Sequence, residues 1–587
     1  MAPMQLKSLK LERFRSCTNT TINLRPDLTV LIGENNSGKS NIIDAIRLLT
    51  LPLNGRRERY PEDENLQRGS TDSAFTIEGR YSDMSNNVKG LLISAVPDPA
   101  ADLAIIGMRY QVKIAPNPHG KTTFYGSKFE TAEIEPGATE LIRHVFLPPL
   151  RDARQALGSG SATRITALLE HFLATDEDKT DFIEYVKRSE TPHPAITAIN
   201  SEIDTKINDL TRGVRRQEAS LGFITENLSD VARDLRFRLA DAGIKPEDIR
   251  SSGLGYANLL YMSTVIVELA KAREADLTLF LVEEPEAHLH PQLQMLVLDF
   301  LLEQAKQSAT QEIIAGQPEG RIQVIVTTHS PNLTAWVSPE HLVVVRSMRD
   351  EVANPPTHHT TSIPIAMLGL SNQTLNKIRR YLDVTRSALL FGNRAILLEG
   401  IAEALLLPAI AKHLVLRDNP DFLQRFRGTQ LIPIDGVDFE PYVEILLHPF
   451  NGITVVDHLI LVTDNDPAVR GDRKAHLEGL VTGWGVAEKL RIFTNTVTLE
   501  HELFIAGNEA LLKKAFLTIH TKSADRWTKD IEGVTLENRA EAFVELLKNT
   551  KTLKGEFAQQ LVDFIENGET FRVPAYLEQA IQRATEI

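Results

Sequence analysis

Two pairs of carboxylates follow apolar runs in the last third of the chain. Glu399 and Glu403 stand four residues apart, and Asp464 and Asp466 stand two apart, each pair directly after such a run. The runs are typical of buried strands, and carboxylates at strand ends supply the oxygen ligands that hard cations prefer. Because residues i and i+4 of a helix share a face, Glu399 and Glu403 are expected to point the same way. The pattern predicts a cage for divalent cations, with solvated acidic turns as the alternative.

These residue types fit the hydrolysis of phosphodiester bonds. Two metal ions about 4 Å apart can activate water, stabilise the leaving oxygen and relieve charge on the phosphate. Glu500 adds an acid after the strand-like run 490–497, and Lys554 stands at an expected helix start. A lysine there would stabilise negative charge on the scissile phosphate. The alternative for Lys554 is a solvated basic face, since Lys548 and Lys551 are close in sequence.

A second phosphate chemistry is indicated near the N-terminus. Residues 33–40 read G-E-N-N-S-G-K-S, a complete phosphate-binding loop between an expected strand and an expected helix. Lys39 would pair with the β- and γ-phosphates, Ser40 would hold Mg²⁺, and the helix N-terminus would add its dipole. The predicted nucleotide-binding residues of the loop are Gly33, Asn35, Asn36, Gly38, Lys39 and Ser40.

Three later segments, taken in order, resemble the ATPase core of ABC and SMC-like proteins. They are a Ser/Gly turn at 251–255, an apolar strand at 279–282 that leads into Glu-Glu-Pro-Glu, and a strand at 324–328 before a histidine. The resemblance implies a signature loop at Ser252 and Gly253, a Walker B metal ligand at Glu283, a catalytic glutamate at Glu284 and a switch histidine at His329. The usual Walker B acid is aspartate, so Glu283 departs from the pattern. In this group two protomers sandwich the nucleotide, which implies a homodimer.

Bulk properties limit the class of protein. A chain of 587 residues needs two to four domains. The net charge of −14 favours no general nucleic-acid surface, so any such surface must be local. Cys17 is the only cysteine, which excludes internal disulfides and a thiolate metal site. No signal core and no bilayer-spanning apolar run is expected, so the sequence predicts an intracellular, cytoplasmic protein without a membrane partner.

The hydrophobic pattern indicates an α/β protein in four parts. Alternating segments near 75–81 and 108–114 predict an antiparallel sheet beside the first strands. Helical periodicity dominates from about 160 to 245, which indicates an insertion for dimerisation or, alternatively, a lid. The predicted parts are an N-terminal ATPase segment (1–160), the helical insertion (161–245), a C-terminal ATPase segment (246–388) and a Rossmann-like domain (389–587).

The acidic motifs resemble the Toprim domain of topoisomerases, primases and related nucleases. A glutamate–glycine strand end, Glu399-Gly400, is followed after about sixty residues by Asp464-Asn465-Asp466. An ABC-type ATPase with a helical insertion and a C-terminal Toprim domain resembles the OLD (overcoming lysogenization defect) family of nucleases. The resemblance implies metal ligands at Glu399, Glu403, Asp464, Asp466 and Glu500, with Lys554 as the late basic residue.

The family resemblance also implies cofactors and partners. It predicts ATP and Mg²⁺, with Mn²⁺ or Ca²⁺ as alternatives in the nuclease site, DNA as substrate and a homodimer or higher homo-oligomer. Family members include phage-exclusion proteins, the nuclease of Gabija antiviral systems and retron effectors, so a helicase or a retron nucleic acid is a candidate partner. The competing hypothesis is an SMC- or RecF-like repair ATPase that binds DNA ends without cleaving them. A topoisomerase or primase is weaker, because the sequence has no tyrosine motif and no zinc-binding cysteines.

Overall fold

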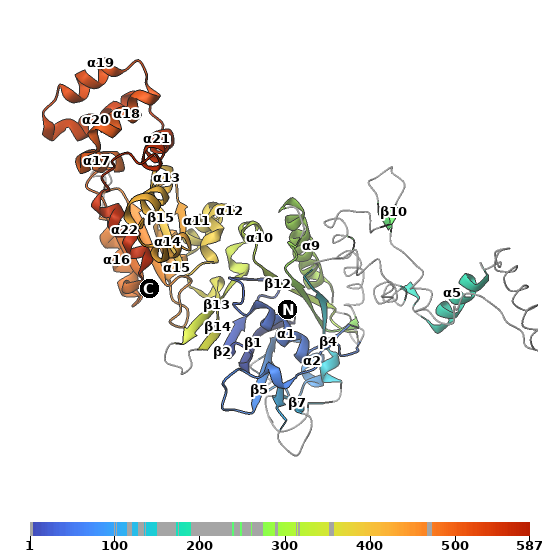
Figure 1. Cartoon of the computed structure of the whole chain (residues 1–587). Coiled ribbons are helices and arrows are strands. Elements are labelled where there is room, and N and C mark those ends of the chain that lie inside the picture. The colour runs from blue at the N-terminus through green and yellow to red at the C-terminus, as the bar shows by residue number, and fades with distance from the viewer. Residues whose placement is uncertain are drawn as a thin grey trace, which may run out of the picture.

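The computed structural model describes most of the chain in two long stretches (Figure 1). These stretches are residues 4–149 without 54, 99, 101, 114–119, 127–133 and 136, and residues 274–586 without 288–290, 313, 315–316, 351–356 and 466–471. Between them the described residues are 169, 172–173, 175–188, 238–239, 247–248 and 260.

A seven-stranded sheet forms the centre of the N-terminal half. Its order is β14-β13-β3-β12-β11-β8-β4, and all neighbouring pairs are parallel except β14 with β13. The strands are β3 (Leu28–Ile32), β4 (Leu51–Pro52), β8 (Ile142–Leu147), β11 (Leu277–Glu283), β12 (Arg321–Thr328), β13 (Leu342–Asp350) and β14 (Thr357–Pro364). Strands β3 and β11 are apolar almost throughout and buried at every position, because both faces of the sheet are covered. The carboxyl ends of β3, β12 and β11 therefore share one edge.

A five-stranded antiparallel sheet covers one face of this centre, as the alternating segments predicted. Its order is β2-β1-β5-β6-β7. The strands are β1 (Gln5–Phe14), β2 (Cys17–Asn23), β5 (Ala74–Ser82), β6 (Leu103–Gln111) and β7 (Lys121–Gly126). Helix α1 (Lys39–Leu49) lies in the core between the two sheets, where Ile42 and Ile46 join Leu9 and Phe75 in one buried cluster. Helix α2 (Asn86–Leu91) follows β5, and α9 (Pro291–Thr310) and α10 (Pro331–Trp336) lie on the other face of the seven-stranded sheet.

The C-terminal part is built on a four-stranded parallel sheet, ordered β16-β15-β17-β18. The strands are β15 (Arg394–Leu398), β16 (Gln430–Pro433), β17 (His458–Thr463) and β18 (Leu490–Thr494). Helices α15 (Glu440–Leu447) and α16 (Arg473–Gly483) cover one face, and α13 (Ile401–Ile410) and α14 (Pro420–Arg427) cover the other. This is the α/β arrangement that the sequence predicted.

Helices close the chain on the α13 side. They are α17 (Leu499–Leu503), α18 (Glu509–Ile519), α19 (Ala524–Trp527), α20 (Arg539–Asn549), α21 (Lys554–Glu566) and α22 (Ala575–Thr585). Helix α21 packs on α13, and α22 packs on β17 and β18. Figure 1 shows α18, α19 and α20 at the end of the molecule farthest from the seven-stranded sheet.

The two halves share one hydrophobic core. A single buried cluster contains Val344 of β13, Leu389 of the connection, Leu397 of β15 and Leu446 of α15. Helices α11 (Asn372–Tyr381) and α12 (Val384–Ser387) bridge the last strand of the large sheet and the first strand of the small one. The predicted boundary at 388/389 falls in this bridge and stays a prediction.

Some predictions concern residues outside the described part. Most of the predicted insertion at 161–245 lies there, although the structure describes helix α5 (Asp176–Arg188) and an antiparallel pair formed by β9 (Arg238–Leu239) and β10 (Glu247–Asp248). Among the described residues, no helix is both long and apolar enough to cross a bilayer.

Candidate functional site

The phosphate-binding loop lies between β3 and α1, as the motif predicted. Gly33 has φ 148° and Gly38 has φ 104°, values that side-chain-bearing residues rarely adopt. A Cβ at Gly33 would lie 2.1 Å from the carbonyl oxygen of Val345, and one at Gly38 would lie 2.2 Å from Oγ1 of Thr360. Both glycines are therefore required by backbone conformation and by close packing.

Lys39 is buried inside this loop. Its Nζ donates to the carbonyl oxygens of Gly33 at 2.9 Å and Glu34 at 2.7 Å, and it lies 3.3 Å from Nδ1 of His329. Burial lowers the pKa of Lys39 to about 8, although nearby carboxylates oppose the shift. Neutral carbonyls compensate a buried ammonium only in part, so the anionic phosphates of a nucleotide would be stronger partners for this group.

Glu283 stands at the carboxyl end of β11, close to Ser40. Its side chain is buried, and its Oε1 has no hydrogen-bond partner in the described part of the chain. Burial and the charge of Asp44 raise the pKa of Glu283, and a hydrogen bond with Ser40 opposes the rise. A buried carboxylate oxygen beside the Ser40 hydroxyl is a donor set that fits Mg²⁺. The assignment of Glu283 as the metal ligand of this site stays a prediction.

His329 joins the loop to two glutamates. Its Nδ1 lies 3.1 Å from the carbonyl oxygen of Gly33, and its Nε2 lies 3.3 Å from Oε1 of Glu284. Glu284 adopts φ 45°, an uncommon conformation for a non-glycine residue that often marks functional sites. Glu286, to which the sequence assigned no role, accepts from the backbone N–H of His329 at 2.8 Å and from Oγ1 of Thr328 at 2.7 Å. Its place in the acidic run after β11 was the available signal.

The remaining predicted nucleotide residues divide into two groups. Asn35 and Asn36 are exposed at the tip of the loop, and Asn36 adopts φ 64°. Ser252 and Gly253, the predicted signature loop, lie outside the described residues.

At the carboxyl edge of the small sheet, Glu399 follows β15 and Asp464 follows β17. The two strands pair in parallel, which brings both acids to one place. Oε2 of Glu399 accepts from Oγ1 of Thr463 at 2.7 Å and from the backbone N–H of Asp464 at 2.9 Å. Arg473 donates to Oγ1 of Thr463 at 2.7 Å and lies 3.8 Å from Glu399. The end of β15 is therefore tied to the end of β17.

Glu399 lies at a strand end and Glu403 one helical turn later, as predicted, but the two residues do not belong to one helix. Helix α13 begins at Ile401 with Gly400 as its N-cap, so Glu399 still belongs to the strand end. Glu403 lies in the first turn of α13, and a Cβ at Gly400 would be only 3.6 Å from its Oε2. A strand-to-helix turn, not a common helix face, brings the two acids to the same edge.

Burial and mutual repulsion favour protonation of this cluster. Burial, with the charges of Asp464 and Glu500, raises the pKa of Glu403 to about 8. Burial also raises the pKa of Asp464 to about 6, with a hydrogen bond from Asn495 opposing the rise and the charges of Glu399 and Glu500 adding to it. Carboxylates that cannot all ionise in a buried site gain most from a divalent cation. The chemistry of this donor set therefore fits Mg²⁺ or Mn²⁺.

Glu500 and Lys554 belong to the same cluster. Glu500 lies on α17 with 6% exposure, and Lys554 begins α21. Nζ of Lys554 lies 3.1 Å from Oε1 of Glu500. Burial lowers the pKa of Lys554, but the carboxylates of Glu500, Asp464 and Glu403 outweigh it and raise the pKa overall. The Lys554 side chain is 64% exposed, but its ion pair with Glu500 ties it to the acids.

Asn495, the residue directly after β18, also belongs to the cluster, although the sequence assigned it no role. Its Nδ2 donates to Oδ1 of Asp464, and its Oδ1 accepts from the backbone N–H of Asn465 at 3.0 Å. Tyr576 of α22 is buried nearby, and burial and the charges of Glu403 and Asp464 raise its pKa far above the ordinary value. Asn495 could have been found from the rule that polar residues gather after successive parallel strands; no sequence signal pointed to Tyr576.

Among the described residues, no group of three histidine, cysteine, aspartate or glutamate side chains stands in a metal-binding arrangement. Asp466, the predicted fourth ligand, lies outside the described residues. Oε2 of Glu399 accepts from Thr463 and from the Asp464 N–H, and neither of these bonds uses Oε1. The metal-ligand assignments stay predictions.

The raised pKa values predict an unusual pH dependence of stability. Without metal, the folded state keeps protons on Glu403 up to about pH 8 and on Asp464 up to about pH 6, whereas the unfolded chain releases them near pH 4. The folded state then binds more protons, so this contribution to the free energy of unfolding is full below pH 4 and is lost as pH rises toward 8. Each tenfold difference in proton affinity between the folded and unfolded states corresponds to about 1.4 kcal/mol.

Thermal unfolding in EDTA between pH 5 and 8 checks this dependence. The melting temperature of Glu403→Gln should fall less over this range than that of the wild type, and saturating Mg²⁺ should reduce the wild-type fall. The exposed control Glu537→Gln should behave as the wild type does. Equal slopes for wild type and Glu403→Gln would contradict the assignment of a buried, protonated Glu403.

Two family models match the chain. Residues 4–209 and 168–334 match the AAA ATPase domain, and together they make up more than half of the chain. Residues 390–466 match the "Overcoming lysogenization defect protein-like, TOPRIM domain". The first model includes the phosphate loop and β11, and the second includes β15, β17 and the acids between 399 and 466.

The chain is similar to two curated proteins and to one solved structure. The chain is 22% identical over 441 residues to the Old nuclease of Escherichia phage P2, covering 70% of each protein. It is 38% identical over 79 residues to the DNA replication and repair protein RecF of Staphylococcus aureus, covering 14% of this chain and 20% of RecF. Among solved structures, the C-terminal region of the Burkholderia pseudomallei OLD protein is 26% identical, covers 33% of this chain and 97% of that one, and superposes with a TM-score of 0.24.

Proposed function

Because this chain belongs to the OLD-like family, in which an AAA ATPase domain precedes a TOPRIM domain, we propose that it is a DNA nuclease regulated by ATP. One observation carries the proposal: two half-buried acids, directly after β15 and β17, and two buried acids, on α13 and α17, meet beside one lysine. A module that only binds DNA would have no need of buried carboxylates with raised pKa values. The Old nuclease of phage P2, similar over 70% of both chains, supports the same activity.

The chain's own residues divide the work of cleavage. Glu399, Glu403, Asp464 and Glu500, with Asp466, would hold divalent ions. Bound there, the ions would supply an activated water and charge neutralisation at the phosphate, the basis of two-metal hydrolysis. Lys554 stands 3.1 Å from Glu500 and would stabilise negative charge that develops on the scissile phosphate. Asn495 orients Asp464 through its amide.

We propose that nucleotide bound at the phosphate loop regulates DNA cleavage. Gly33, Gly38 and Lys39 would receive the phosphates, and Ser40 with Glu283 would hold Mg²⁺. Glu284, 3.3 Å from His329, would accept a proton from the attacking water. The predicted signature loop at Ser252 and Gly253 would complete the site of a second protomer, so the proposed active form is a homodimer.

Incubation of the purified protein with plasmid DNA and Mg²⁺ or Mn²⁺ tests the proposal. The expected result is conversion of supercoiled plasmid to nicked or linear products, abolished by EDTA. The RecF-like alternative, which a similarity over 79 residues supports, expects bound but intact plasmid under every metal condition, together with ATP hydrolysis.

Glu284→Gln should separate ATP hydrolysis from ATP binding. An amide cannot accept a proton, so the hydrolysis rate is expected to fall about 100-fold, the lower end for loss of a general base. ATP affinity should stay close to the wild-type value, measured by titration calorimetry. The exposed control Glu312→Gln should hydrolyse ATP normally, and wild-type hydrolysis by Glu284→Gln would remove Glu284 from the mechanism.

We propose phage defence or phage exclusion as the biological setting, on the strength of the similarity to a phage nuclease. Plating phages on a host that expresses the chain, with Asp464→Ala as the matched inactive form, tests this setting. Reduced plaque formation that requires Asp464 is the expected outcome; equal plating on both strains would reject it.

A further inference from the structure

A buried arginine joins the large sheet to the small one. Arg346 of β13 has a side chain that is 5% exposed. Its guanidinium donates to the carbonyl oxygen of Thr454 at 2.6 Å, to Oδ1 of Asn393 at 2.8 Å, and to both carboxylate oxygens of Asp457 at 3.2 and 2.6 Å. A bidentate contact between a guanidinium and a carboxylate fixes the relative orientation of the two groups as well as their distance. Arg346 thus holds three points of the C-terminal domain at once.

Two of these three points are the starts of the strands that lead to the acids. Asn393 directly precedes β15, Asp457 directly precedes β17, and the N–H of Asp457 donates to the carbonyl oxygen of Asn393 at 2.8 Å. From there the strands run side by side in register up to Leu398 and Val462. Glu399 and Asp464 lie just beyond their other ends. A shift of one strand start relative to the other would therefore change the spacing of the acids.

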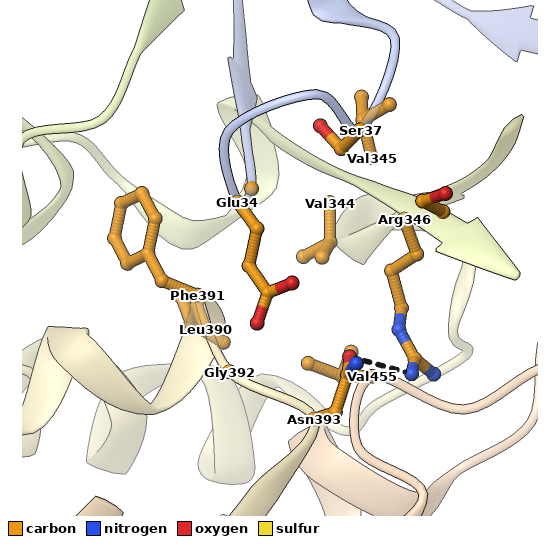
Figure 2. A pocket seen from close by; sticks show the side chains of 12 residues that line it. Glu34, Ser37, Val344, Val345, Arg346, Leu390, Phe391, Gly392, Asn393 and Val455 are labelled. Carbon is orange, nitrogen blue, oxygen red and sulfur yellow. Dashed lines mark hydrogen bonds between the residues drawn. The ribbon is translucent and has the colours of Figure 1, made fainter. Parts of the chain in front are cut away.

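The same stretch of β13 lies against the phosphate loop. The carbonyl oxygen of Val345, next to Arg346, is the atom that a Cβ at Gly33 would meet at 2.1 Å. Figure 2 shows the Glu34 side chain pointing from the loop toward Gly392 and Asn393. The loop, β13 and the segment Leu390–Asn393 before β15 line a partly open cavity of about 10 Å³, room for about one water molecule. So small a gap allows little movement of the loop without movement of its neighbours.

Nucleotide binding must change the loop at this contact. Lys39 donates to the carbonyl oxygens of Gly33 and Glu34, and pairing with phosphates would release one or both of these bonds. Both carbonyls belong to the residues that line the cavity. The release of these Lys39 bonds is thus local to the loop. The neighbouring segments that line the same cavity are β13 and Leu390–Asn393.

We propose that Arg346 couples the nucleotide state of the phosphate loop to the spacing of the acids at the carboxyl edge of the small sheet. The inference rests on the proposed function and names the regulation of that site. We call the carboxyl edge of the small sheet, with its acids, the acidic edge. By linkage the coupling is reciprocal, so metal bound at the acidic edge should change nucleotide affinity by the same factor by which nucleotide changes metal affinity. Coupling of this type typically amounts to roughly a 5- to 150-fold change.

Arg346→Gln tests the proposal, with Arg346→Lys as a milder variant that keeps the charge and loses the bidentate contact. The matched control is Arg386→Gln. Arg386 also joins the two halves, through Oδ2 of Asp435 at 2.7 Å and the carbonyl oxygen of Ile434, but it has no described contact with the phosphate loop. Hydrogen exchange of peptides covering 390–398 and 455–463 is measured with and without AMP-PNP and Mg²⁺. Mn²⁺ affinity is measured by calorimetry under the same two conditions.

In the wild type and in Arg386→Gln, AMP-PNP should change both the exchange and the Mn²⁺ affinity. In Arg346→Gln both responses should disappear, while AMP-PNP binding persists and the melting temperature shows a folded protein. Arg346→Lys should give an intermediate response, which keeps the test valid if Arg346→Gln fails to fold.

Two results would overturn the coupling: an unchanged AMP-PNP response in Arg346→Gln and Arg346→Lys, or equal loss in Arg386→Gln. Neither readout requires DNA cleavage. If the wild type binds Mn²⁺ and responds to AMP-PNP but leaves plasmid intact, the proposed nuclease activity fails and the coupling stands.

Discussion

Replacement of Asp464 with alanine is expected to lower the rate of DNA cleavage at least about 100-fold, the order seen when one electrostatic stabiliser is removed from an active site. Asp464 stands at the end of β17, is held by Asn495, and is close enough to Glu399 and Glu500 for their charges to raise its pKa. Its loss would remove a proposed metal ligand and leave Asn495 without its acceptor. Plasmid cleavage in Mg²⁺ and in Mn²⁺ measures the effect.

ATP binding provides the internal control for Asp464→Ala. The phosphate loop lies in the other half of the chain, so ATP affinity should stay within about twofold of the wild type. Asp525→Ala, an exposed aspartate on α19, controls for the loss of one surface charge and should cleave normally. Cleavage by Asp464→Ala at the wild-type rate would remove the acidic edge from the mechanism.

Replacement of Lys39 with alanine is expected to weaken ATP binding about 100-fold. Hydrogen bonds to charged groups contribute about 1.5–3 kcal/mol each, so loss of one or two gives at least a 10-fold effect and readily 100-fold. The loop also loses the bonds to the carbonyl oxygens of Gly33 and Glu34 that hold it closed. Titration calorimetry with ATP and Mg²⁺ measures the affinity.

Lys39→Ala should spare the acidic edge. Mn²⁺ binding to the C-terminal domain should be retained, and any effect of ATP on cleavage should vanish. The exposed control Lys522→Ala should bind ATP as the wild type does. If Lys39→Ala bound ATP normally, the nucleotide site would lie elsewhere in the chain.

Local sequence patterns were sufficient to predict the helices and strands that carry the motifs. The helix expected after the phosphate-binding loop is α1 (Lys39–Leu49), and the strand expected at 279–282 lies within β11 (Leu277–Glu283). Glycines with restricted roles, continuous apolar runs and acids after strands are all signals carried by neighbouring residues. The acids Glu399, Glu403, Asp464 and Glu500 could thus be named before their geometry was known.

Long-range contacts could not be predicted in this way. Arg346 meets Asp457 across 111 positions of sequence, and an arginine in a strand has no local signature of a junction. Glu286 and Asn495 were missed because their partners are a histidine 43 positions away and an aspartate 31 positions away. The four-residue spacing of Glu399 and Glu403 suggests one helix face, but helix α13 begins only at Ile401 and Glu399 stays at the strand end. Contacts between residues far apart in sequence determine the roles of these residues, and local periodicity does not reveal such contacts.

Phosphorothioate DNA tests most directly whether metal at the acidic edge contacts the scissile phosphate. Sulfur in place of a phosphate oxygen binds Mg²⁺ poorly and softer Mn²⁺ better. Cleavage at the modified linkages is expected to slow about 10-fold or more in Mg²⁺ and to recover in Mn²⁺, with Asp464→Ala inactive in both metals. The same slowing in Mg²⁺ and Mn²⁺, or cleavage by Asp464→Ala, would show that no metal at the acidic edge contacts the phosphate that is cut.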